Sequence, residues 1–273
     1  MSFKHFRLKL ISAAIVAVTA PVSGGPVETE HVTIQLVSDR DSLQPGRSIL
    51  VGLYFEMENE WHIYWRNPGD SGEAPRIQWN LPAGFQAGEV QWPAPARLGS
   101  GSVIDYGYQQ PVLLYVEIKT PKNLAVGNKE TLSADVSWLV CKDICVPGKT
   151  SLTLSLFVRT RPGPMTTSRA LFQEARSRVP RPLPPAWSAD ALSDRDSFLL
   201  TIRGAGVGKK SFFPLEVDQV DNAAPQTTTA LPDGVRLTLK KSDRLLKTPA
   251  MLNGILELGS GRAYIISALV RSP

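Results

Sequence analysis

Short runs in which apolar and polar residues alternate recur between residues 31 and 158, and this alternation constrains the fold more than any other feature. The runs are rich in β-branched and aromatic residues, and Pro, Gly, Asn and Asp separate them, as is typical of half-buried β-strands. They are HVTIQLV (31–37), SILVGLYFEM (48–57), WHIYW (61–65), RIQWNL (76–81), PVLLYVEI (111–118), TLSADVSWLV (131–140) and SLTLSLFV (151–158). About seven strands at this spacing predict an antiparallel β-sandwich.

The alternation is clearest just before the two cysteines. One face of the predicted strand carries Leu132, Ala134, Val136, Trp138 and Val140, and the other carries Ser133, Asp135, Ser137, Leu139 and Cys141. The partner strand turns Leu152, Leu154 and Leu156 inward. The pattern therefore predicts a hairpin with the cysteines at its end, connected by KDICVPGK, with Pro147 and Gly148 closing the turn.

The composition changes after Arg161. The segment TTSRALFQEARSRV (166–179) predicts one short amphipathic helix, and PRPLPPAW (180–187) is typical of a semi-rigid linker. Strand patterns then resume in SFLLTIRG, KSFFPLEV, GVRLTLKK, NGILELG and AYIISALV. We therefore predict an all-β chain with a first β domain at 25–161, a helix and linker at 162–187, and a second, smaller β domain at 188–273.

The N-terminus is typical of a secretory signal peptide. Lys4, Arg7 and Lys9 precede the apolar run LISAAIVAVTAPVSG, and the small residues near Gly24 offer a cleavage site. We expect residues 1–24 to be removed and the mature protein to be exported. An uncleaved N-terminal anchor is the alternative, although the apolar run is short for a membrane span.

The charge does not favour a nucleic-acid partner. The full chain has a formal net charge of +5, but removal of residues 1–24 leaves 27 basic and 25 acidic residues, a net charge of +2. The basic clusters KKSFF and LKKSDRLLK are not interleaved with aromatic residues as a nucleic-acid groove requires. We expect no nucleic acid among the partners.

The chain has two cysteines, Cys141 and Cys145, in the segment SWLVCKDICVPGK. In an oxidising compartment so close a pair forms a disulfide unless another protein reduces it. Three interpretations stay open at this point: a structural disulfide, a metal site completed by His31 or His62, and a pair that exchanges disulfides with partners.

Several separated motifs resemble one family. EMENEWHIYWRNPGDSGEAPRIQWNLPAGF, VQWPAP, DYGYQQPVLLYVEI and WLVCKDICVPGKTSLTLSL occur in the order found in the periplasmic N-terminal domain of the thiol:disulfide interchange protein DsbD, and more closely in its ScsB-type relatives. SFFPLE and NGILELGSGRAYIISAL are similar to the second extracytoplasmic β domain of ScsB-type proteins. The resemblance implies an immunoglobulin-like β-sandwich that passes reducing equivalents from a membrane-embedded thiol relay protein to a periplasmic thioredoxin-like acceptor.

The resemblance also implies roles for individual residues. Cys141 and Cys145 match the redox pair, with Cys145 joining partners and Cys141 resolving the mixed disulfide. VIDYGYQ (103–109) matches an aromatic cap loop, which makes Asp105, Tyr106 and Tyr108 candidates for the cap and for partner binding, with Tyr106 as the lid. We expect no cofactor and no metal.

The family normally continues into a transmembrane domain and a thioredoxin-like domain, and this chain ends at Pro273 without them. We therefore expect a stand-alone periplasmic module that a separate membrane protein recharges. The competing interpretations are a two-domain β adaptor with a structural disulfide, and a Cu(I) carrier.

Overall fold

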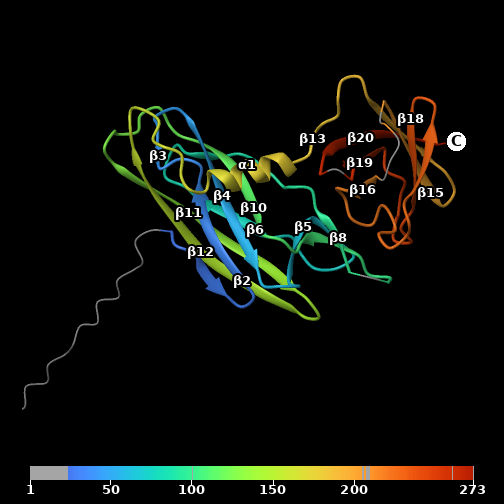
Figure 1. Cartoon of the computed structure of the whole chain (residues 1–273), viewed down its shortest axis with the longest axis horizontal. Coiled ribbons are helices and arrows are strands. Elements are labelled where there is room, and N and C mark those ends of the chain that lie inside the picture. The colour runs from blue at the N-terminus through green and yellow to red at the C-terminus, as the bar shows by residue number, and fades with distance from the viewer. Residues whose placement is uncertain (1–23, 100, 205, 207–209, 260, 273) are drawn as a thin grey trace, which may run out of the picture.

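The computed structural model describes residues 24–99, 101–204, 206, 210–259 and 261–272. Strands dominate these residues and form three sheets, accompanied by one helix, α1 (Arg169–Arg178) (Figure 1). The predicted all-β class is confirmed. The predicted signal peptide lies outside the described residues except for Gly24, and no helix among the described residues has the length and hydropathy needed to cross a bilayer.

Two of the sheets pack face to face, and their buried side chains form one continuous core. The first sheet contains, in spatial order, β1 (Val27–Thr29), β2 (Val32–Ser38), β4 (Ser48–Met57), β10 (Val112–Lys119) and β7 (Gln86–Ala87). The second contains β3 (Ser42–Leu43), β12 (Cys145–Val158), β11 (Lys129–Cys141), β5 (His62–Gly69), β9 (Asp105–Tyr108) and β8 (Ala96–Leu98), and β6 (Arg76–Asn80) also pairs with β11. The result is the expected immunoglobulin-like β-sandwich.

The alternation in the sequence decides which side chains enter this core. In β4, Val51, Leu53 and Phe55 are fully buried, and each buried side chain of this size stabilises the fold by about 1.5–3 kcal/mol. In β11, Trp138 is 4% exposed, whereas the neighbouring Ser137 is exposed. The apolar face of the predicted strand is the face that is buried.

The hairpin of β11 and β12 has a shorter connection than predicted. Cys141 pairs with Cys145, so only residues 142–144 connect the strands, and Pro147 and Gly148 lie within β12 opposite Leu139 and Trp138. A Cβ atom at Gly148 would lie 2.4 Å from the Trp138 ring, so this position needs glycine for close packing rather than for a turn. The predicted turn at Pro147 and Gly148 is therefore wrong.

Helix α1 covers the outer face of the first sheet. Its buried residues, Phe172 and Ala175, pack with Val37, Leu113 and Tyr115. The Phe172 ring meets the Tyr115 ring edge-on with the ring centroids 5.9 Å apart. The predicted amphipathic helix thus packs the chain that follows β12 against the outer face of the first sheet.

The third sheet lies beside the sandwich in Figure 1 and has its own core, which includes Phe198, Leu200 and Leu237. It contains, in spatial order, β16 (Ser211–Pro214), β19 (Met251–Glu257), β20 (Ala263–Arg271), β14 (Ser188–Ser193), β15 (Ser197–Arg203), β18 (Gly234–Lys240) and β17 (Thr227–Leu231), with β13 (Arg181–Pro182) paired to β20. The sequence patterns missed β14 and β17 because SADALS and TTTAL carry few large apolar residues.

Contacts also join the third sheet to the sandwich. Phe213 of β16 packs edge-on against Trp65 and Tyr106, with ring centroids 6.4 Å and 5.2 Å apart. Asn67 donates hydrogen bonds from Nδ2 to the carbonyls of Pro214 and Glu216 at 2.8 Å and 3.2 Å. The division into domains at 25–161 and 188–273 stays a prediction, and these contacts define the junction between the two parts.

Candidate functional site at the disulfide

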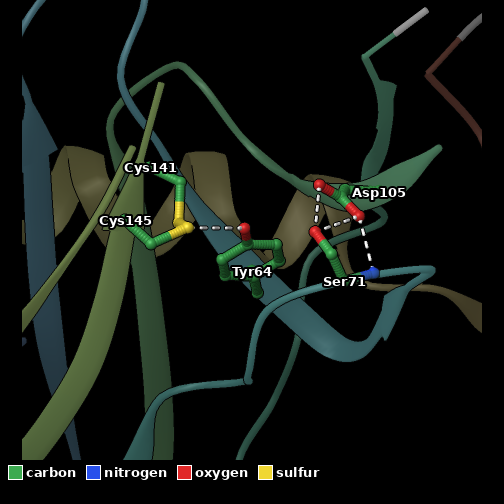
Figure 2. Close-up of a disulfide and its surroundings, with 5 residues drawn as sticks. All are labelled: Tyr64, Ser71, Asp105, Cys141 and Cys145. Carbon is green, nitrogen blue, oxygen red and sulfur yellow. Dashed lines mark hydrogen bonds between the residues drawn. A yellow bond between two sulfur atoms is a disulfide. The ribbon is translucent and has the colours of Figure 1, made fainter. Parts of the chain in front are cut away.

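A disulfide bond joins Cys141, the last residue of β11, to Cys145, the first residue of β12 (Figure 2). The short connection between them is closed by a hydrogen bond of 3.1 Å from the Lys142 amide to the Ile144 carbonyl. The pairing places both sulfur atoms at the end of the hairpin, where the strand pattern predicts them.

The two cysteines differ in exposure. Cys141 is 2% exposed, whereas Cys145 is exposed and follows Ile144, which is 67% exposed. Disulfide exchange requires a thiolate to approach one of the two sulfur atoms. Burial hinders that approach at Cys141 and leaves it open at Cys145.

Strand β5 lies beside Cys141 and supplies two aromatic side chains. Cys141 pairs with His62, so their side chains are cross-strand neighbours on the same face of the sheet. Because side chains alternate along a strand, Tyr64 shares this outer face, while Ile63 and Trp65 enter the core, where both are fully buried. The outer face at this end of the sheet therefore holds Cys141, His62 and Tyr64 together.

The Tyr64 hydroxyl lies 3.6 Å from Sγ of Cys145 (Figure 2). A disulfide sulfur carries no hydrogen, so the hydroxyl is the donor of this weak hydrogen bond. Burial raises the pKa of Tyr64, a hydrogen bond with Ser71 lowers it, and the nearby charge of Asp105 raises it. With its pKa raised on balance, the phenol stays protonated at neutral pH and can donate to sulfur.

Residues 70–72 follow β5, and we refer to them as the covering loop because they lie against Tyr64. The Ser71 amide donates a hydrogen bond of 2.9 Å to Oδ1 of Asp105, and the Ser71 hydroxyl donates to both carboxylate oxygens at 2.9 Å (Figure 2). Gly72 has a φ of 73°, and a Cβ atom there would lie 2.0 Å from Cζ of Tyr64. The backbone conformation and the close ring both require glycine at this position.

His62 is 9% exposed and meets the Tyr64 ring edge-on, with the ring centroids 5.1 Å apart. In the part of the chain that the structure describes, Nε2 of His62 has no hydrogen-bonding partner. Burial lowers the pKa of His62, and the charge of Asp105 opposes this effect in part. The folded protein therefore favours the neutral imidazole.

We expect His62 to make the protein less stable as the pH falls below about 6.5. The pKa of an unfolded His is about 6.5, and the pKa of folded His62 lies below its ordinary value, so the unfolded chain binds more protons in this range. The stability contributed by neutral His62 is complete above about pH 6.5 and is lost as the pH falls towards the folded pKa. Urea unfolding at several pH values should show a flatter pH dependence for His62→Phe, and equal slopes for the two proteins would contradict this expectation.

The charges next to Cys145 nearly balance. Nζ of Lys142 lies 2.6 Å from Oε2 of Glu60, and this hydrogen bond and charge raise the pKa of Lys142 and lower that of Glu60. Asp143 adds a second negative charge on the connection itself. The surroundings of Cys145 are therefore not strongly positive, and Lys142 alone cannot account for a stabilised thiolate.

Among the residues that the structure describes, no group of three or more His, Cys, Asp or Glu side chains is arranged to hold a metal ion. His31 is one of the two histidines that the metal-site interpretation needs as a further ligand. It stacks on Trp61 with the ring centroids 3.6 Å apart, and its Nδ1 lies 2.7 Å from Oε2 of Glu58. Trp61 and Glu58 therefore hold the His31 side chain in place.

Comparisons with known proteins bear directly on the sandwich. Residues 35–156, which include both cysteines and the covering loop, match the family model described as thiol:disulfide interchange protein DsbD, N-terminal. The chain carries a DsbD N-terminal-like domain. The resemblance seen in the sequence motifs is confirmed.

The fold extends this likeness beyond the DsbD N-terminal-like domain. The crystal structure of the N-terminal periplasmic domain of ScsB from Proteus mirabilis matches with a TM-score of 0.65 and 16% sequence identity, over 90% of this chain and 97% of that one. So large a coverage includes the third sheet as well as the sandwich. No curated protein sequence matches the chain.

Within the DsbD N-terminal-like domain, the segment expected to form an aromatic cap loop is largely strand β9. Asp105 lies on the site side, because its carboxylate binds Ser71 (Figure 2). The next side chain points the other way: Tyr106 is fully buried in the core, and its hydroxyl donates a hydrogen bond of 2.8 Å to Oδ1 of Asn222. Tyr108 is 2% exposed, and its hydroxyl donates to the Pro93 carbonyl at 2.7 Å.

The expectation that Tyr106 covers the disulfide is therefore corrected. Strand alternation sends Asp105 and Gly107 to one face and both tyrosines to the other, so Tyr106 and Tyr108 pack inside the sandwich. Tyr64, which sequence reasoning did not single out, is the tyrosine beside the sulfur. The available signal was WHIYW, in which alternation places Tyr64 on the same face as His62 and opposite the two tryptophans.

Proposed function

We propose that this chain is a periplasmic thiol:disulfide exchange module that uses Cys141 and Cys145 to carry reducing equivalents. In this proposal a membrane-embedded thiol relay protein reduces the pair, and a thioredoxin-like protein accepts the electrons. The observation that carries the proposal is the unequal exposure of the two sulfur-bearing residues within a DsbD N-terminal-like domain. A cleaved leader at residues 1–24 and a periplasmic location belong to the same proposal.

In the proposed exchange, Cys141 and Cys145 take up two electrons from the relay protein and then pass two electrons to the acceptor. For recharging, a thiolate of the relay attacks Sγ of Cys145, the bond between the cysteines breaks, and Cys141 leaves as the thiolate and takes up a proton. The second thiolate of the relay then displaces Cys145, so the relay becomes a disulfide and Cys141 and Cys145 become thiols. For delivery, the Cys145 thiolate attacks the acceptor's disulfide, and Cys141 then attacks Cys145 and releases the acceptor as a dithiol.

Tyr64 supports the proposal because its hydroxyl can serve both states of Cys145. It donates a weak hydrogen bond to the disulfide sulfur, and the same donor would bind a thiolate more strongly because hydrogen bonds to charged acceptors are stronger. Stabilising the thiolate of Cys145 over its thiol lowers the pKa of that cysteine. In this respect Tyr64 supplies what the balanced charges of Lys142 and Glu60 do not.

Redox titration of the purified protein tests the proposal. We expect the disulfide to be reduced in glutathione or dithiothreitol buffers with a midpoint above about −300 mV, because exchanging disulfides have less negative potentials than structural ones. Alkylation with a maleimide after acid quenching, followed by mass spectrometry, counts the free thiols at each potential. A pair that stays oxidised below about −300 mV would identify a structural disulfide and favour the adaptor interpretation.

A further inference from the structure

Asn222 is a buried polar residue that the proposed exchange does not use. It belongs to the C-terminal part, in the segment between β16 and β17, and is 6% exposed. Its Oδ1 accepts a hydrogen bond of 2.8 Å from the Tyr106 hydroxyl, and its Nδ2 donates one of 2.8 Å to Oδ1 of Asp70. The Arg97 guanidinium also donates to its carbonyl. All three partners belong to the sandwich, so Asn222 forms polar contacts across the junction between the two parts.

The contact with Asp70 reaches the covering loop directly, because Asp70 is the first residue of that loop. The other carboxylate oxygen of Asp70 accepts a hydrogen bond of 2.8 Å from the Ile104 amide, and the Asp70 amide donates one of 3.0 Å to the Ile104 carbonyl. Asp70 is thus held between Asn222 on one side and the chain just before β9 on the other. The position of Asp70 therefore determines where the next two residues, Ser71 and Gly72, lie.

Those next two residues are the ones that meet the disulfide site. Ser71 binds Asp105, and Gly72 lies against the ring of Tyr64, whose hydroxyl contacts Cys145. A continuous series of contacts therefore runs from Asn222 through Asp70 and the covering loop to Tyr64 and Sγ of Cys145. Part of this series is visible in Figure 2, where Ser71 lies between Asp105 and Tyr64.

We infer that Asn222 is a positioning residue for the disulfide site: from the C-terminal sheet it holds Asp70, and thereby keeps the covering loop closed over Tyr64. This gives the C-terminal part a role in setting how readily Cys145 exchanges. The inference deepens the proposed function and rests on it for its biological meaning. Loss of the contact with Asp70 should not separate the two parts of the chain, because Asn67 and Phe213 join them independently of Asn222.

The test exchanges the residue types at the two ends of the hydrogen bond between Asn222 and Asp70. Asn222→Asp keeps an acceptor for Tyr106 but places a carboxylate against Asp70, which should push the covering loop away from Tyr64. We expect the rate at which dithiothreitol reduces the disulfide to change roughly 3- to 10-fold in this variant relative to the wild-type protein. In the double variant Asn222→Asp/Asp70→Asn, the new amide can donate to the new carboxylate and still accept from Ile104. Its rate should return close to that of the wild type.

Two further variants keep the inference falsifiable. Asn253→Ala removes an asparagine that hydrogen bonds with Ser267 and Glu216 inside the C-terminal part, and it should leave the reduction rate unchanged. Tyr106→Phe removes only the hydroxyl that donates to Asn222, and it provides the test if Asn222→Asp does not fold. We expect it to change the reduction rate in the same direction by a smaller factor. Thermal unfolding of every variant shows whether a change in rate merely follows a change in stability.

The outcomes separate the two hypotheses. Dithiothreitol needs no partner protein, so equal rates in the wild type, Asn222→Asp and Tyr106→Phe would overturn the role of Asn222 while leaving the proposed function intact. A change in rate that the double variant does not reverse would also overturn it. A wild-type disulfide that resists the glutathione titration would instead refute the proposed function, whatever the variants do.

Discussion

Cys141→Ala, produced in an oxidising compartment, should accumulate as a mixed disulfide with partner proteins through Cys145. The exposed Cys145 can still attack or be attacked, but the thiol that would release the partner is gone. Electrophoresis without reductant should show a large fraction of the protein in higher-mass bands, and reductant should return it to the monomer position. Cys145→Ala should trap little, because its remaining thiol at Cys141 is buried and therefore poorly reactive.

Exposure alone could produce adducts, so the matched control places a thiol at the neighbouring position. The variant Cys141→Ala/Cys145→Ala/Ile144→Cys has its one cysteine at the residue next to Cys145, a position that is 67% exposed. If the site beside Tyr64 promotes exchange, this control should trap far less than Cys141→Ala. Equal trapping by the two proteins would show that exposure is sufficient. Equal trapping by Cys141→Ala and Cys145→Ala would refute the assigned roles of the two cysteines.

The seven longer strands of the sandwich could be predicted because each has a recognisable pattern in its own residues. Runs such as SILVGLYFEM alternate or stay apolar according to burial, and β4 occupies the residues that the run predicts. The helix was predicted from its amphipathic pattern, and α1 lies within the predicted segment. These elements depend on local periodicity, which the sequence displays directly.

The contacts around the sulfur could not be predicted in the same way. Tyr64, Ser71 and Asp105 come from three separate segments, and only the pairing of β5 with β9 and β11 brings them together. The error over Tyr106 has a different cause. The segment DYGY was interpreted as a loop by resemblance, whereas interpreting it as a strand would have separated Asp105 from Tyr106 by alternation.

The turn at Pro147 and Gly148 was predicted wrongly because the local signal competed with a longer-range one. The dipeptide is typical of turns, but the register of the long hairpin, in which Cys141 pairs with Cys145, carries β12 past it. Gly148 then serves the packing of Trp138 instead. A glycine in a sequence therefore does not reveal which of its two properties, backbone freedom or small size, the fold requires.

Gly72→Ala should destabilise the protein far more than Gly101→Ala, although both glycines have a φ of 73°. An alanine at either position pays the cost of a left-handed backbone, about 1–3 kcal/mol. At Gly101 the new Cβ meets nothing within 4 Å, whereas at Gly72 it would lie 2.0 Å from Cζ of Tyr64. Overpacking of this kind adds about 1–3 kcal/mol, and urea unfolding of the two variants measures the difference.

The same pair of variants should also separate in their chemistry. Tyr64 is 1% exposed and has little room to move, so the added Cβ atom in Gly72→Ala must displace the covering loop, the Tyr64 ring or both. Either movement disturbs the contact of the Tyr64 hydroxyl with Cys145 and should change the rate at which dithiothreitol reduces the disulfide. Gly101→Ala should keep the wild-type rate. If Gly72→Ala matches Gly101→Ala in both stability and reduction rate, the covering loop does not constrain Tyr64. The loop would then not be what holds the Tyr64 hydroxyl beside the sulfur of Cys145.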